Sequence, residues 1–521
     1  MKLIDVETMR NMDVELTNQG IPEIIPMEHA GKAISDVALT MLEEKQRVVI
    51  VAGKGNNGGD GFCAARWLNT ANKKVQCFGL GMSRNEAMTE YNMLTDSGVE
   101  VVNLRTQADL DYLQMSIAKA DLVIDALLGT GFAGELEEDI AKICDSMNKA
   151  TCPVLSVDIP TGVNADTGMV AEHAVKAAAT VTLARVKVGM LLYPAKENVG
   201  KLFVADIGFP AKLLARDVSP YYLVDKKMVG EMLPIREQDA HKGDNGRVTV
   251  IAGSKGFVGA AALATKGAVK VGAGLVSLLT PESASAVLAM KLDEEMVHPL
   301  PEAEGGLADT AVQKVLTCGG DVLAIGPGLG KSEGTVKAVQ EIVRTSQVPL
   351  IIDADALTAL KDNLKVLTEN TVAKILTPHA GEFSRLTGLE IEDINSNRLS
   401  LAVKYAKKWN VILLLKGAPT IVALPSGAAY LVNSGTSAMA TGGSGDVLTG
   451  VIAGLVAQGL ELDAAAICGA YLHGLAGTLA TNGTPGLAAG EIAQNLPFAW
   501  QEVYADEEEN KFNNYAIKTI G

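Results

Sequence analysis

Apolar runs alternate with helical stretches along the first half of the chain, and this alternation restricts the folds that it can adopt. The runs are rich in β-branched residues and almost continuously apolar: RVVIVA (47–52), KVQCFGL (74–80), ADLVIDAL (120–127) and CPVLSVDI (152–159). Helical stretches precede or separate them, at 6–16, 28–43, 85–96 and 138–148. Apolar strands that alternate with helices are typical of a parallel sheet covered on both faces. The pattern therefore predicts an α/β fold.

A second α/β pattern follows a weakly patterned stretch. Between 209 and 244 the chain is charged and contains prolines, and we place a domain boundary there. The strands that we predict beyond it are RVTVIAG (247–253), AGLVSLL (273–279), DVLAIG (321–326), PLIIDAD (349–355) and VILLLKG (411–417). Glycine-rich helices fill 441–480. We therefore expect domains at 1–215 and 225–505, and an acidic tail at 506–521 that begins in the charged run ADEEEN (505–510).

The charge balance and the cysteines exclude several classes of protein. Lysine and arginine total 45 against 61 acidic residues, a net charge of −16, which argues against nonspecific binding to nucleic acid or to an anionic membrane. Residues 464–490 carry no Asp, Glu, Lys or Arg, but polar residues and Pro485 interrupt them, so we expect core helices and not a membrane span. The six cysteines form no CxxC pair, and no apolar leader is apparent. These features favour a cytoplasmic protein with free thiols.

The first chemical motif is the loop GKGNNGGDG, which runs from Gly53 to Gly61 directly after the strand 47–52. Its glycines match G-x-G-x-x-G, the pattern that binds phosphate at a helix N-terminus. As a dinucleotide fingerprint the match is incomplete, because the next strand ends without the expected acid. A tight turn alone would explain the glycines. It would not need Asn56, Asn57 and Asp60, whose polar side chains favour a ligand site.

Two further motifs place aspartates at predicted strand ends. Asp125 begins DALLGTG (125–131), and Asp158 lies in SVDIPTG (156–162). Either carboxylate could simply cap a helix. However, parallel strands end at one sheet edge, where ligands of open α/β sheets bind, and convergence of three such motifs is harder to explain by capping. Their oxygen atoms could also hold a hard cation.

Together these three motifs, in this order, resemble the epimerase domain of the enzymes that repair hydrated NAD(P)H, over roughly residues 1–215. The resemblance implies a Rossmann-like three-layer fold and interconversion of the R and S epimers at C6 of NADHX and NADPHX. It implies potassium ligands at Asn57, Asp125 and Thr161, where the family more often has serine at the last position. It implies substrate contacts at Asn56, Asn57, Gly58, Gly59, Asp60, Gly129, Thr130, Gly131, Phe132, Ala133, Gly134, Glu135 and Asp158. Asp158 is a plausible proton-transfer group, because epimerisation through ring opening needs an acid or base near the C6 hydroxyl.

The strongest motif of the second half is ATGGSGDVL (440–448). Gly442, Gly443 and Gly445 precede an apolar helix, so backbone N–H groups there could hold a transferring phosphoryl group. Asp446 would then accept a proton from an attacking hydroxyl. The alternative is that Asp446 caps the helix and the glycines permit close packing. A Walker A loop at GLGKS (328–332) is excluded, because Ile325 stands where that motif needs glycine.

GGSGD resembles the anion hole and catalytic aspartate of ribokinase-like enzymes. Sugar kinases of that class usually carry an acid six residues before the aspartate, where this chain has Ala440. The whole motif resembles instead the ADP-dependent NAD(P)HX dehydratase, with support from HKGDNGRVTVIAGS (241–254), IGPGLG (325–330), IIDADAL (351–357), TPHAGEFSRL (377–386) and LLKGAPTIV (414–422). The resemblance covers nearly all of 225–505 and implies a ribokinase-like α/β domain.

This second resemblance also implies residue roles. Nucleotide binding would fall to Lys416, Gly417, Ala418, Pro419, Thr420 and Gly445. Contacts to NAD(P)HX would come from Ala261, Gly328, His379 and Asp446. Asp446 would deprotonate the C6 hydroxyl, which takes a phosphoryl group from ADP, and magnesium would accompany the nucleotide. His379 alone would be read as a structural histidine and Lys416 as an ordinary lysine at a strand end. Asp353 and Asp355 could be linked to magnesium or could cap helices.

We therefore predict an enzyme that epimerises R- and S-NAD(P)HX and dehydrates the S epimer to NAD(P)H, with ADP converted to AMP and phosphate. Its partners would be small molecules, with no nucleic acid and no membrane, and the large apolar second half suggests a homo-oligomer. One alternative is a ribokinase-like kinase for a small alcohol such as a vitamin. Another is a first half that binds a nucleotide or a protein without catalysis.

Overall fold

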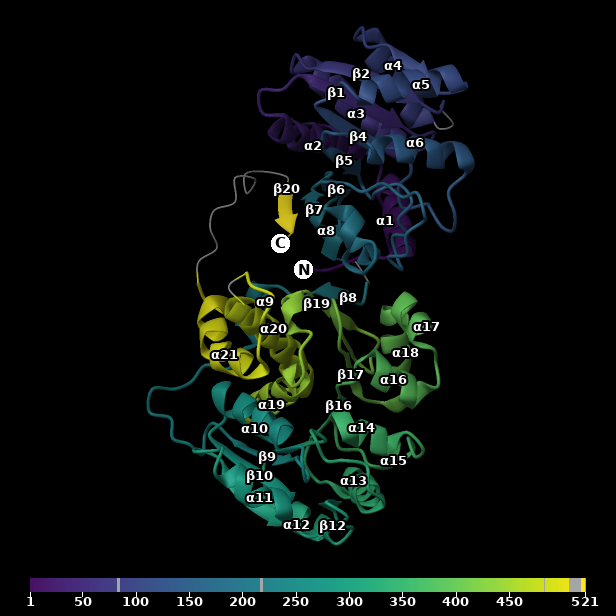
Figure 1. Cartoon of the computed structure of the whole chain (residues 1–521). Coiled ribbons are helices and arrows are strands. Elements are labelled where there is room, and N and C mark those ends of the chain that lie inside the picture. The colour runs from purple at the N-terminus through teal and green to yellow at the C-terminus, as the bar shows by residue number, and fades with distance from the viewer. Residues whose placement is uncertain (82–84, 216–218, 482, 506–516, 521) are drawn as a thin grey trace. The chain divides into compact units, whose positions relative to one another are not determined.

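The computed structural model describes residues 1–81, 85–215, 219–481, 483–505 and 517–520 (Figure 1). The chain divides into two compact units, of which the first holds residues 2–219 and the segment from 507 onward. The second holds Met1 and residues 220–506. The division at Ser219 falls inside the weakly patterned stretch 209–244. Each unit is an α/β structure, as the strand pattern predicts.

One sheet of eight strands forms the centre of the first unit. Its order is β20-β7-β6-β5-β4-β1-β2-β3, and every pairing is parallel except that of β20 with β7. The strands are β1 (Arg47–Ala52), β2 (Lys74–Gly79), β3 (Val101–Asn103), β4 (Leu122–Ala126), β5 (Val154–Val157), β6 (Ala179–Leu183), β7 (Lys201–Ala205) and β20 (Ile517–Ile520). The four strands predicted here are confirmed as β1, β2, β4 and β5.

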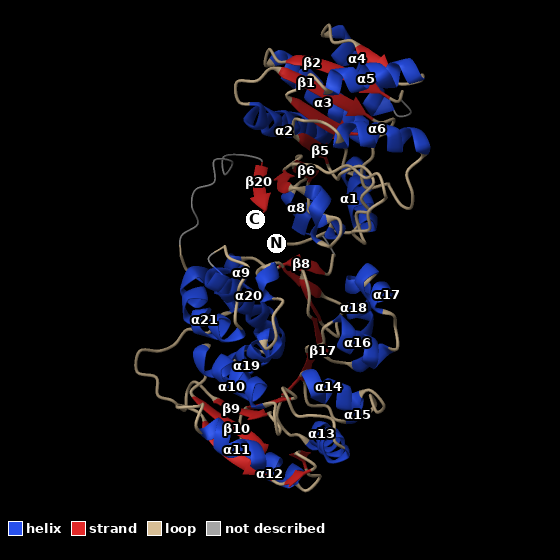
Figure 2. Cartoon of the chain, in the orientation of Figure 1, coloured by secondary structure: helices blue, strands red, loops and turns tan. Residues whose placement is uncertain are grey.

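Helices cover both faces of this sheet (Figure 2). The longer ones are α1 (Val6–Asn18), α2 (Ile24–Leu42), α3 (Asn56–Thr70), α4 (Asn85–Asp96), α5 (Gln107–Ile117) and α6 (Glu138–Asn148), with the short α7 (Lys196–Val199) and α8 (Ala211–Ala215). Alternate side chains of β1 show why its sequence is continuously apolar. Val48 and Ile50 join a buried cluster with α2, α3 and α4, whereas Val49 and Val51 join one with α5 and α6.

The strand order reverses beside β1. From β1 the chain adds β2 and β3 on one side, and then adds β4 to β7 on the other. Such a switch point opens a crevice at the carboxyl ends of the strands. Gly53 follows β1 there, and a Cβ atom on it would lie 1.8 Å from the carbonyl oxygen of Leu127. The first glycine of the motif is therefore required by the close approach of two loops.

The C-terminal segment requires a correction. We predicted an acidic tail at 506–521, but Ile517–Ile520 form strand β20, which pairs antiparallel to β7. Ile517 is buried in the core of the first unit. The charged part of the tail, at 506–516, lies outside the described residues. The tail was misassigned because a four-residue strand carries too little pattern to be recognised after a charged run.

The second unit contains a sheet of ten strands in the order β11-β10-β9-β14-β15-β16-β17-β18-β19-β8. They are β8 (Tyr221–Leu223), β9 (Arg247–Ile251), β10 (Leu275–Pro281), β11 (Met296–Leu300), β14 (Val322–Ile325), β15 (Leu350–Ile352), β16 (Lys374–Leu376), β17 (Ile412–Leu415), β18 (Thr420–Ala423) and β19 (Ala429–Val432). The pairings from β11 to β17 are parallel, and β18 pairs antiparallel with both of its neighbours. A two-stranded sheet, β12 (Glu302–Ala303) and β13 (Gly306–Leu307), is separate.

Figures 1 and 2 show helices on both faces of this sheet, with α10, α19 and α20 on one side and α13, α14, α16 and α18 on the other. The helices are α9 (Lys226–Met232), α10 (Val258–Lys270), α11 (Glu282–Ala289), α12 (Ala311–Cys318), α13 (Glu333–Thr345), α14 (Ala354–Leu360), α15 (Val366–Glu369), α16 (Ala380–Thr387), α17 (Ile391–Ser396), α18 (Arg398–Trp409), α19 (Ser444–Ala457), α20 (Leu462–Thr481) and α21 (Ala489–Val503). Among the described residues, α20 alone is long and apolar enough to cross a membrane, and 67% of its apolar window is buried inside the structure. This burial is expected of a core helix.

The contact between α10 and α19 predicts the effect of one added methyl group. A Cβ atom on Gly450 would lie 1.8 Å from the carbonyl oxygen of Ala264. We expect Gly450→Ala to lower the free energy of unfolding of the second unit by about 1–3 kcal/mol, the usual cost of overpacking. Urea denaturation followed by circular dichroism measures the change. Gly490→Ala in α21 is the control, because open space surrounds that position; equal losses in both variants would contradict the packing argument.

Candidate functional site

A pocket of about 1180 Å³ lies in the first unit, where the loops after β1 and β4 meet. Its lining includes seven of the predicted substrate contacts: Asn56, Asn57, Asp60, Gly129, Thr130, Gly131 and Asp158. Helix α1 adds Met9, Arg10 and Asp13. Of the other predicted contacts, Gly58 and Gly59 pack against Gly53 and Met27 beneath the loop. Phe132, Ala133, Gly134 and Glu135 continue the loop after β4 and do not line this pocket.

Asp125 is fully buried at the end of β4 and organises the floor of this region. Its carboxylate accepts hydrogen bonds from the Thr161 backbone N–H at 2.9 Å, the Thr161 hydroxyl at 2.7 Å and the Ser156 hydroxyl at 2.9 Å. Burial raises the pKa of Asp125, and the hydrogen bonds from Thr161 oppose the rise. The Thr161 hydroxyl also accepts from the N–H of Leu128 at 3.0 Å. Two of the three predicted potassium ligands are therefore in direct contact.

Asn57 is the third predicted potassium ligand. Its amide oxygen and nitrogen are both buried and have no hydrogen-bond partner among the described residues. A Cβ atom on Gly129 would lie 3.3 Å from that oxygen, so Asn57 lies against the loop after β4. A buried amide without a partner costs free energy unless a ligand satisfies it. Amide, carboxylate and hydroxyl oxygens are the donors that a hard cation prefers, so the three residues fit potassium.

Asp158 is held in an unusual conformation by a buried ion pair. Its φ is +63°, in the left-handed region that costs free energy for a residue with a side chain. The carboxylate forms an ion pair with Lys187, which is 1% exposed, and accepts from the Leu183 N–H at 3.1 Å. The Lys187 ammonium also donates to the Thr182 hydroxyl at 3.1 Å and the Leu183 carbonyl at 3.0 Å. Sequence reasoning missed Lys187, and its only signal was a lysine within an apolar stretch.

Two other aspartates of the pocket have raised pKa values. Burial raises the pKa of Asp60 well above its ordinary value, and the nearby Asp158 adds to this effect. Burial raises the pKa of Asp13 to about 6, with Lys187 acting in the opposite direction. The pocket therefore combines a carboxylate paired with a lysine, that of Asp158, with acids that retain a proton more readily.

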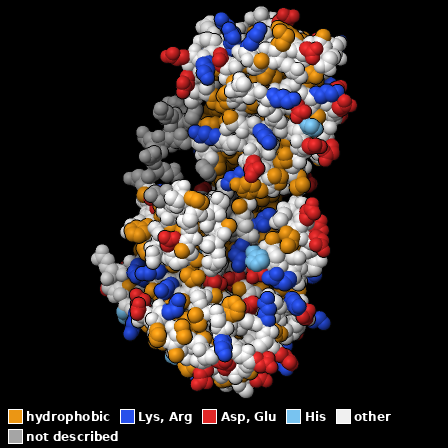
Figure 3. All heavy atoms as spheres, in the orientation of Figure 1, with side chains coloured by type: hydrophobic (Ala, Val, Ile, Leu, Met, Phe, Trp, Pro, Cys, Tyr) orange, Lys and Arg blue, Asp and Glu red, His pale blue; other side chains and the backbone are white. Residues whose placement is uncertain are grey.

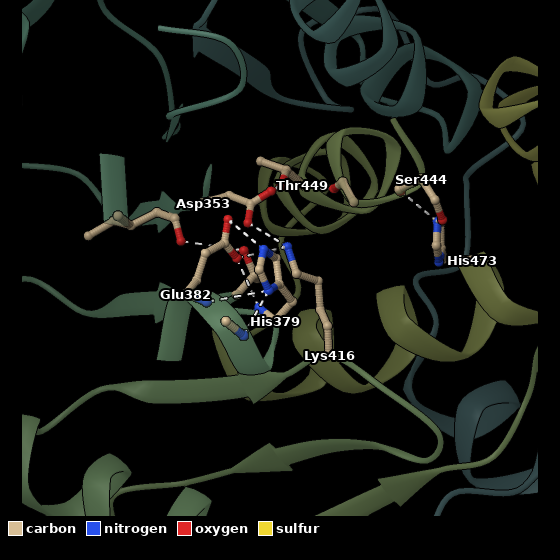
Figure 4. Close-up of polar contacts among 11 residues, drawn as sticks. Asp353, His379, Glu382, Lys416, Ser444, Thr449 and His473 are labelled. Atoms are coloured by element: carbon tan, nitrogen blue, oxygen red, sulfur yellow. Dashed lines mark hydrogen bonds and ion pairs between the residues drawn. The ribbon is translucent and has the colours of Figure 1, made fainter. Parts of the chain in front are cut away.

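The second unit gathers its charged side chains at the carboxyl ends of β15, β16 and β17. Figure 3 shows acidic, basic and histidine side chains in a hollow between the regions that Figure 1 labels α19 and α16. Lys416, after β17, donates to Asp353 at 2.8 Å and lies 3.7 Å from Glu382 (Figure 4). Asp353 also accepts from the Thr449 hydroxyl of α19 at 2.7 Å. Burial alone would lower the pKa of Lys416, but Asp353 and Glu382 raise it, so the ammonium stays charged.

Asp353 and Asp355, whose roles the sequence left open, both make hydrogen bonds in this region. Asp353 precedes α14, but its side chain makes no capping hydrogen bond and holds Lys416 and Thr449 instead. Asp355 accepts from the Gly330 N–H at 3.0 Å and thereby fixes the loop after β14. That loop carries Gly328, whose carbonyl accepts from the Ser254 hydroxyl at 2.7 Å. Ala261 lies buried on α10.

Asp446 lies in the first turn of α19, beside this cluster. Burial, and next the negative Asp353, raise the pKa of Asp446 to about 7, while Lys416 lowers it. A Cβ atom on Gly445 would lie 3.1 Å from the Lys416 ammonium nitrogen, so the helix start and the lysine are neighbours. A carboxyl group with a pKa near neutrality can accept a proton and then release it. Asp446 is not the N-cap residue of α19, which is Gly443, and no side-chain hydrogen bond caps this helix.

His379 both caps a helix, as a structural histidine would, and lies at the charged cluster of the candidate site. Its Nδ1 accepts from the N–H groups of Gly381 at 3.0 Å and Glu382 at 3.3 Å, so the ring caps α16. Burial lowers the pKa of His379, which favours the neutral ring. Because Nδ1 accepts, the proton of the neutral ring lies on Nε2. That nitrogen lies 3.5 Å from the Glu382 carboxylate, at the edge of the charged cluster.

Two more residues of this site were missed by sequence reasoning. Arg398, at the start of α18, donates to the carbonyl oxygens of Leu415 at 3.3 Å, Lys416 at 3.1 Å and Pro419 at 3.2 Å, and thus shapes the predicted nucleotide loop, residues 416–420. Only glycine fits at position 417, because a Cβ atom there would lie 2.4 Å from the Arg398 side chain. Burial lowers the pKa of Arg398 to about 10.

His473 supports the start of α19 from α20. Its Nε2 lies 2.9 Å from the carbonyl oxygen of Ser444, and burial lowers the pKa of this histidine to about 4, so the neutral ring donates to that oxygen (Figure 4). The sequence signal was a single histidine in an apolar helix, which gives no indication of a partner 29 residues away.

Comparisons with known proteins agree with this two-part arrangement. Residues 24–189 match the family model of the YjeF-related protein N-terminus, and residues 248–497 match the model of NAD(P)H-hydrate dehydratase. The bifunctional NAD(P)H-hydrate repair enzyme of Moorella thermoacetica is 39% identical over 98% of both chains. The enzyme of the same name from Escherichia coli is 31% identical over 94% of this chain and 92% of its own.

This chain belongs to the bifunctional NAD(P)H-hydrate repair enzymes. Among solved structures it is similar to the ADP/ATP-dependent NAD(P)H-hydrate dehydratase of Bacillus subtilis, co-crystallised with ATP and Mg²⁺, which is 31% identical, with a TM-score of 0.48 over 54% of this chain and 98% of that one. A ribokinase-like superfamily protein from Enterococcus faecalis is 27% identical, with a TM-score of 0.47 over 55% and 96% of the two chains. The family models and the relatives over the full chain confirm the predicted family, and the two sheets with their helices confirm the predicted α/β fold class.

The ion pair between Lys187 and Asp158 generates a stability prediction. Lys187→Met leaves a buried carboxylate without its cation, and we expect it to lower the free energy of unfolding of the first unit by about 3–5 kcal/mol. Adding Asp158→Asn should recover part of this loss, because no buried charge then remains. Chemical denaturation of the single and double variants measures both effects. A single variant as stable as the wild type would show that the pair is dispensable.

Proposed function

We propose that this chain performs both reactions of its family: it epimerises R- and S-NAD(P)HX, and it dehydrates the S epimer to NAD(P)H while ADP becomes AMP and phosphate. The observation that carries the proposal is the presence, in one chain related over its full length to these enzymes, of two separate clusters of buried charged side chains at the carboxyl ends of parallel strands. One contains Asp158 with Lys187, and the other contains Asp446 with Lys416.

In the dehydratase unit, we assign Asp446 as the general base. It removes the proton of the C6 hydroxyl, and the oxygen attacks the terminal phosphorus of ADP, from which AMP leaves. The N–H groups around Gly442, Gly443 and Gly445 would hold the phosphoryl oxygens, and Lys416 would balance their charge. Loss of phosphate from C6 and of a proton from C5 then restores the double bond of the nicotinamide ring. Phosphate leaves far more readily than hydroxide, which is why ADP is needed.

The remaining predicted contacts position the substrates. The loop of Lys416, Gly417, Ala418, Pro419 and Thr420, shaped by Arg398, would bind the nucleotide. His379 would contact NAD(P)HX, with Ala261 and Gly328 along the dinucleotide. Because Asp353 is already engaged by Lys416 and Thr449, we assign magnesium to the phosphates of the nucleotide, where it would neutralise their charge.

In the epimerase unit, Asp158 would take the proton of the C6 hydroxyl. Asn57, Asp125 and Thr161 would hold potassium, which supplies positive charge for the substrate at the floor of the pocket. The unpartnered amide of Asn57 is the observation that supports this site. We keep the cytoplasmic location and the homo-oligomeric state as predictions.

A single assay tests the bifunctional proposal. Purified protein is given a mixture of R- and S-NADHX with ADP, magnesium and potassium, and the absorbance of the reduced nicotinamide ring is followed. Complete, ADP-dependent recovery of NADH is expected, because dehydration alone would stop when the S epimer is consumed. Partial recovery would contradict the epimerase half. No recovery, with a stable phosphorylated alcohol formed from other substrates and ATP, would favour a kinase.

The raised pKa of Asp446 predicts a pH dependence. A general base works only when deprotonated, so kcat/KM for dehydration should rise with pH through about 7 and level off above it. Asp446→Asn should lower kcat by about 10²–10⁴-fold and abolish this dependence. Asp463→Asn, at the start of α20, is a matched control and should behave as the wild type. An Asp446→Asn enzyme that keeps its rate would exclude the base assignment.

Removal of potassium should affect one reaction only. In buffers where choline replaces potassium, we expect epimerisation of a single NADHX epimer to slow, because the oxygens of Asn57 and Asp125 lose their cation. ADP-dependent dehydration of pure S-NADHX should continue unchanged. Chiral separation of the epimers over time measures the first rate. An epimerisation rate that is independent of potassium would remove this site from the proposal.

A further inference from the structure

Asp60 is a buried acid that has no catalytic role in the reactions proposed above. It lies in the second turn of α3, is 6% exposed and lines the pocket of the first unit. Its carboxyl group makes no hydrogen bond and no ion pair with any described residue. A buried acid normally has such a partner, and one that faces an empty space in a pocket is poised to meet a ligand there.

The charged groups around Asp60 come from four elements. Asp158 follows β5, Glu90 lies on α4 and Asp13 lies on α1, and all three disfavour a negative charge on Asp60. Lys187, just before the turn at 188–191, is the one cation that acts on it, and Lys187 is already paired with Asp158. These neighbours, with burial as the larger cause, raise the pKa of Asp60 well above its ordinary value.

The pocket thus holds two carboxyl groups in different surroundings. Asp158 is paired with the Lys187 ammonium, whereas Asp60 has no such partner among the described residues, and its surroundings favour the protonated acid. Two acids whose surroundings separate their protonation states in this way form an acid–base pair in many enzymes.

We propose that Asp60 is the general acid of the epimerase unit and acts opposite Asp158 as the general base. The inference rests on the proposed epimerase function, and it gives Asp60 a catalytic role in place of a binding contact alone.

Together, Asp158 and Asp60 accept and supply the protons that the ring-opening reaction moves. Asp158 accepts the proton of the C6 hydroxyl, the C6–O bond becomes a carbonyl, and the C6–N1 bond breaks with its electron pair going to N1. Asp60 gives its proton to N1. Rotation about C5–C6 presents the other face of the aldehyde, and N1 attacks C6. The N1 proton returns to Asp60 and the oxygen regains its proton from Asp158. Nothing is oxidised or reduced, and both residues end in their initial states.

Asp60→Asn separates this role from a binding role. Asparagine has nearly the same shape as the protonated acid and still donates a hydrogen bond, but it cannot give up and recover a proton. We therefore expect kcat for epimerisation to fall by about 10²–10⁴-fold while KM stays close to the wild-type value. The assay starts from one purified epimer of NADHX without ADP, so that dehydration does not contribute, and the spontaneous rate is subtracted.

The pH profile gives a second readout. The wild-type rate should decrease at high pH as Asp60 loses its proton, and Asp60→Asn should lack this decrease. Asp96→Asn is the control: Asp96, at the end of α4, is exposed, does not line the pocket and is not among the charges that act on Asp60, so its epimerase rate should be that of the wild type.

Each outcome decides the proposal. A wild-type rate in Asp60→Asn, or a loss that appears only in KM, would overturn it. Chemical denaturation of the same variant, followed by circular dichroism, reports whether the first unit is folded, because dehydration takes place in the other unit. If Asp60→Asn does not fold, the wild-type profile decides, and the absence of a decrease at high pH would overturn the assignment. Failure of the wild type to epimerise would instead remove the proposed function of the first unit.

Discussion

Parallel strands that end at a common edge are the constraint on which both halves of this enzyme depend. Each carboxyl end delivers a short loop to the same side of the sheet, so that residues distant in sequence become neighbours. In the first unit this brings Asp125 of β4 to Thr161 beyond β5. In the second unit it brings Asp353 after β15 to Lys416 after β17. The positions of both sites therefore follow from the order of the strands and not from any single motif.

Both units use the same electrostatic device at that edge. A carboxylate at a strand end is buried, and a lysine from a later segment neutralises it: Lys187 for Asp158, and Lys416 for Asp353. Burying a lone carboxylate would be very costly, and the lysine makes the arrangement possible. The pairing also leaves neighbouring acids without a cation of their own. Asp60 and Asp446 lie in that position, and their raised pKa values suit them to move protons.

The sequence predicted the architecture and the loops well, because strand periodicity and glycine-rich turns are local signals. Strands β1, β4 and β9 were found from their apolar runs. Lys187, Arg398 and His473 could not be found in this way. Each acts through a partner that only the folded chain brings near, and a lone lysine, arginine or histidine has many ordinary explanations. Strand β20 was missed for a related reason: its stability comes from pairing with β7, more than 300 residues earlier in the sequence.

Strand β20 also determines how the two units are connected. The chain leaves the first unit near Ser219, builds the second and then returns, so that β7 gains its outer neighbour only from the last residues. During synthesis the first unit therefore leaves the ribosome with an open sheet edge. Strand β20 can cover this edge only after the whole second unit has been made. Open edges invite pairing with other chains. A first unit made alone, as residues 2–219, would lack β20 and keep the same edge exposed, so the topology of the backbone joins the two units.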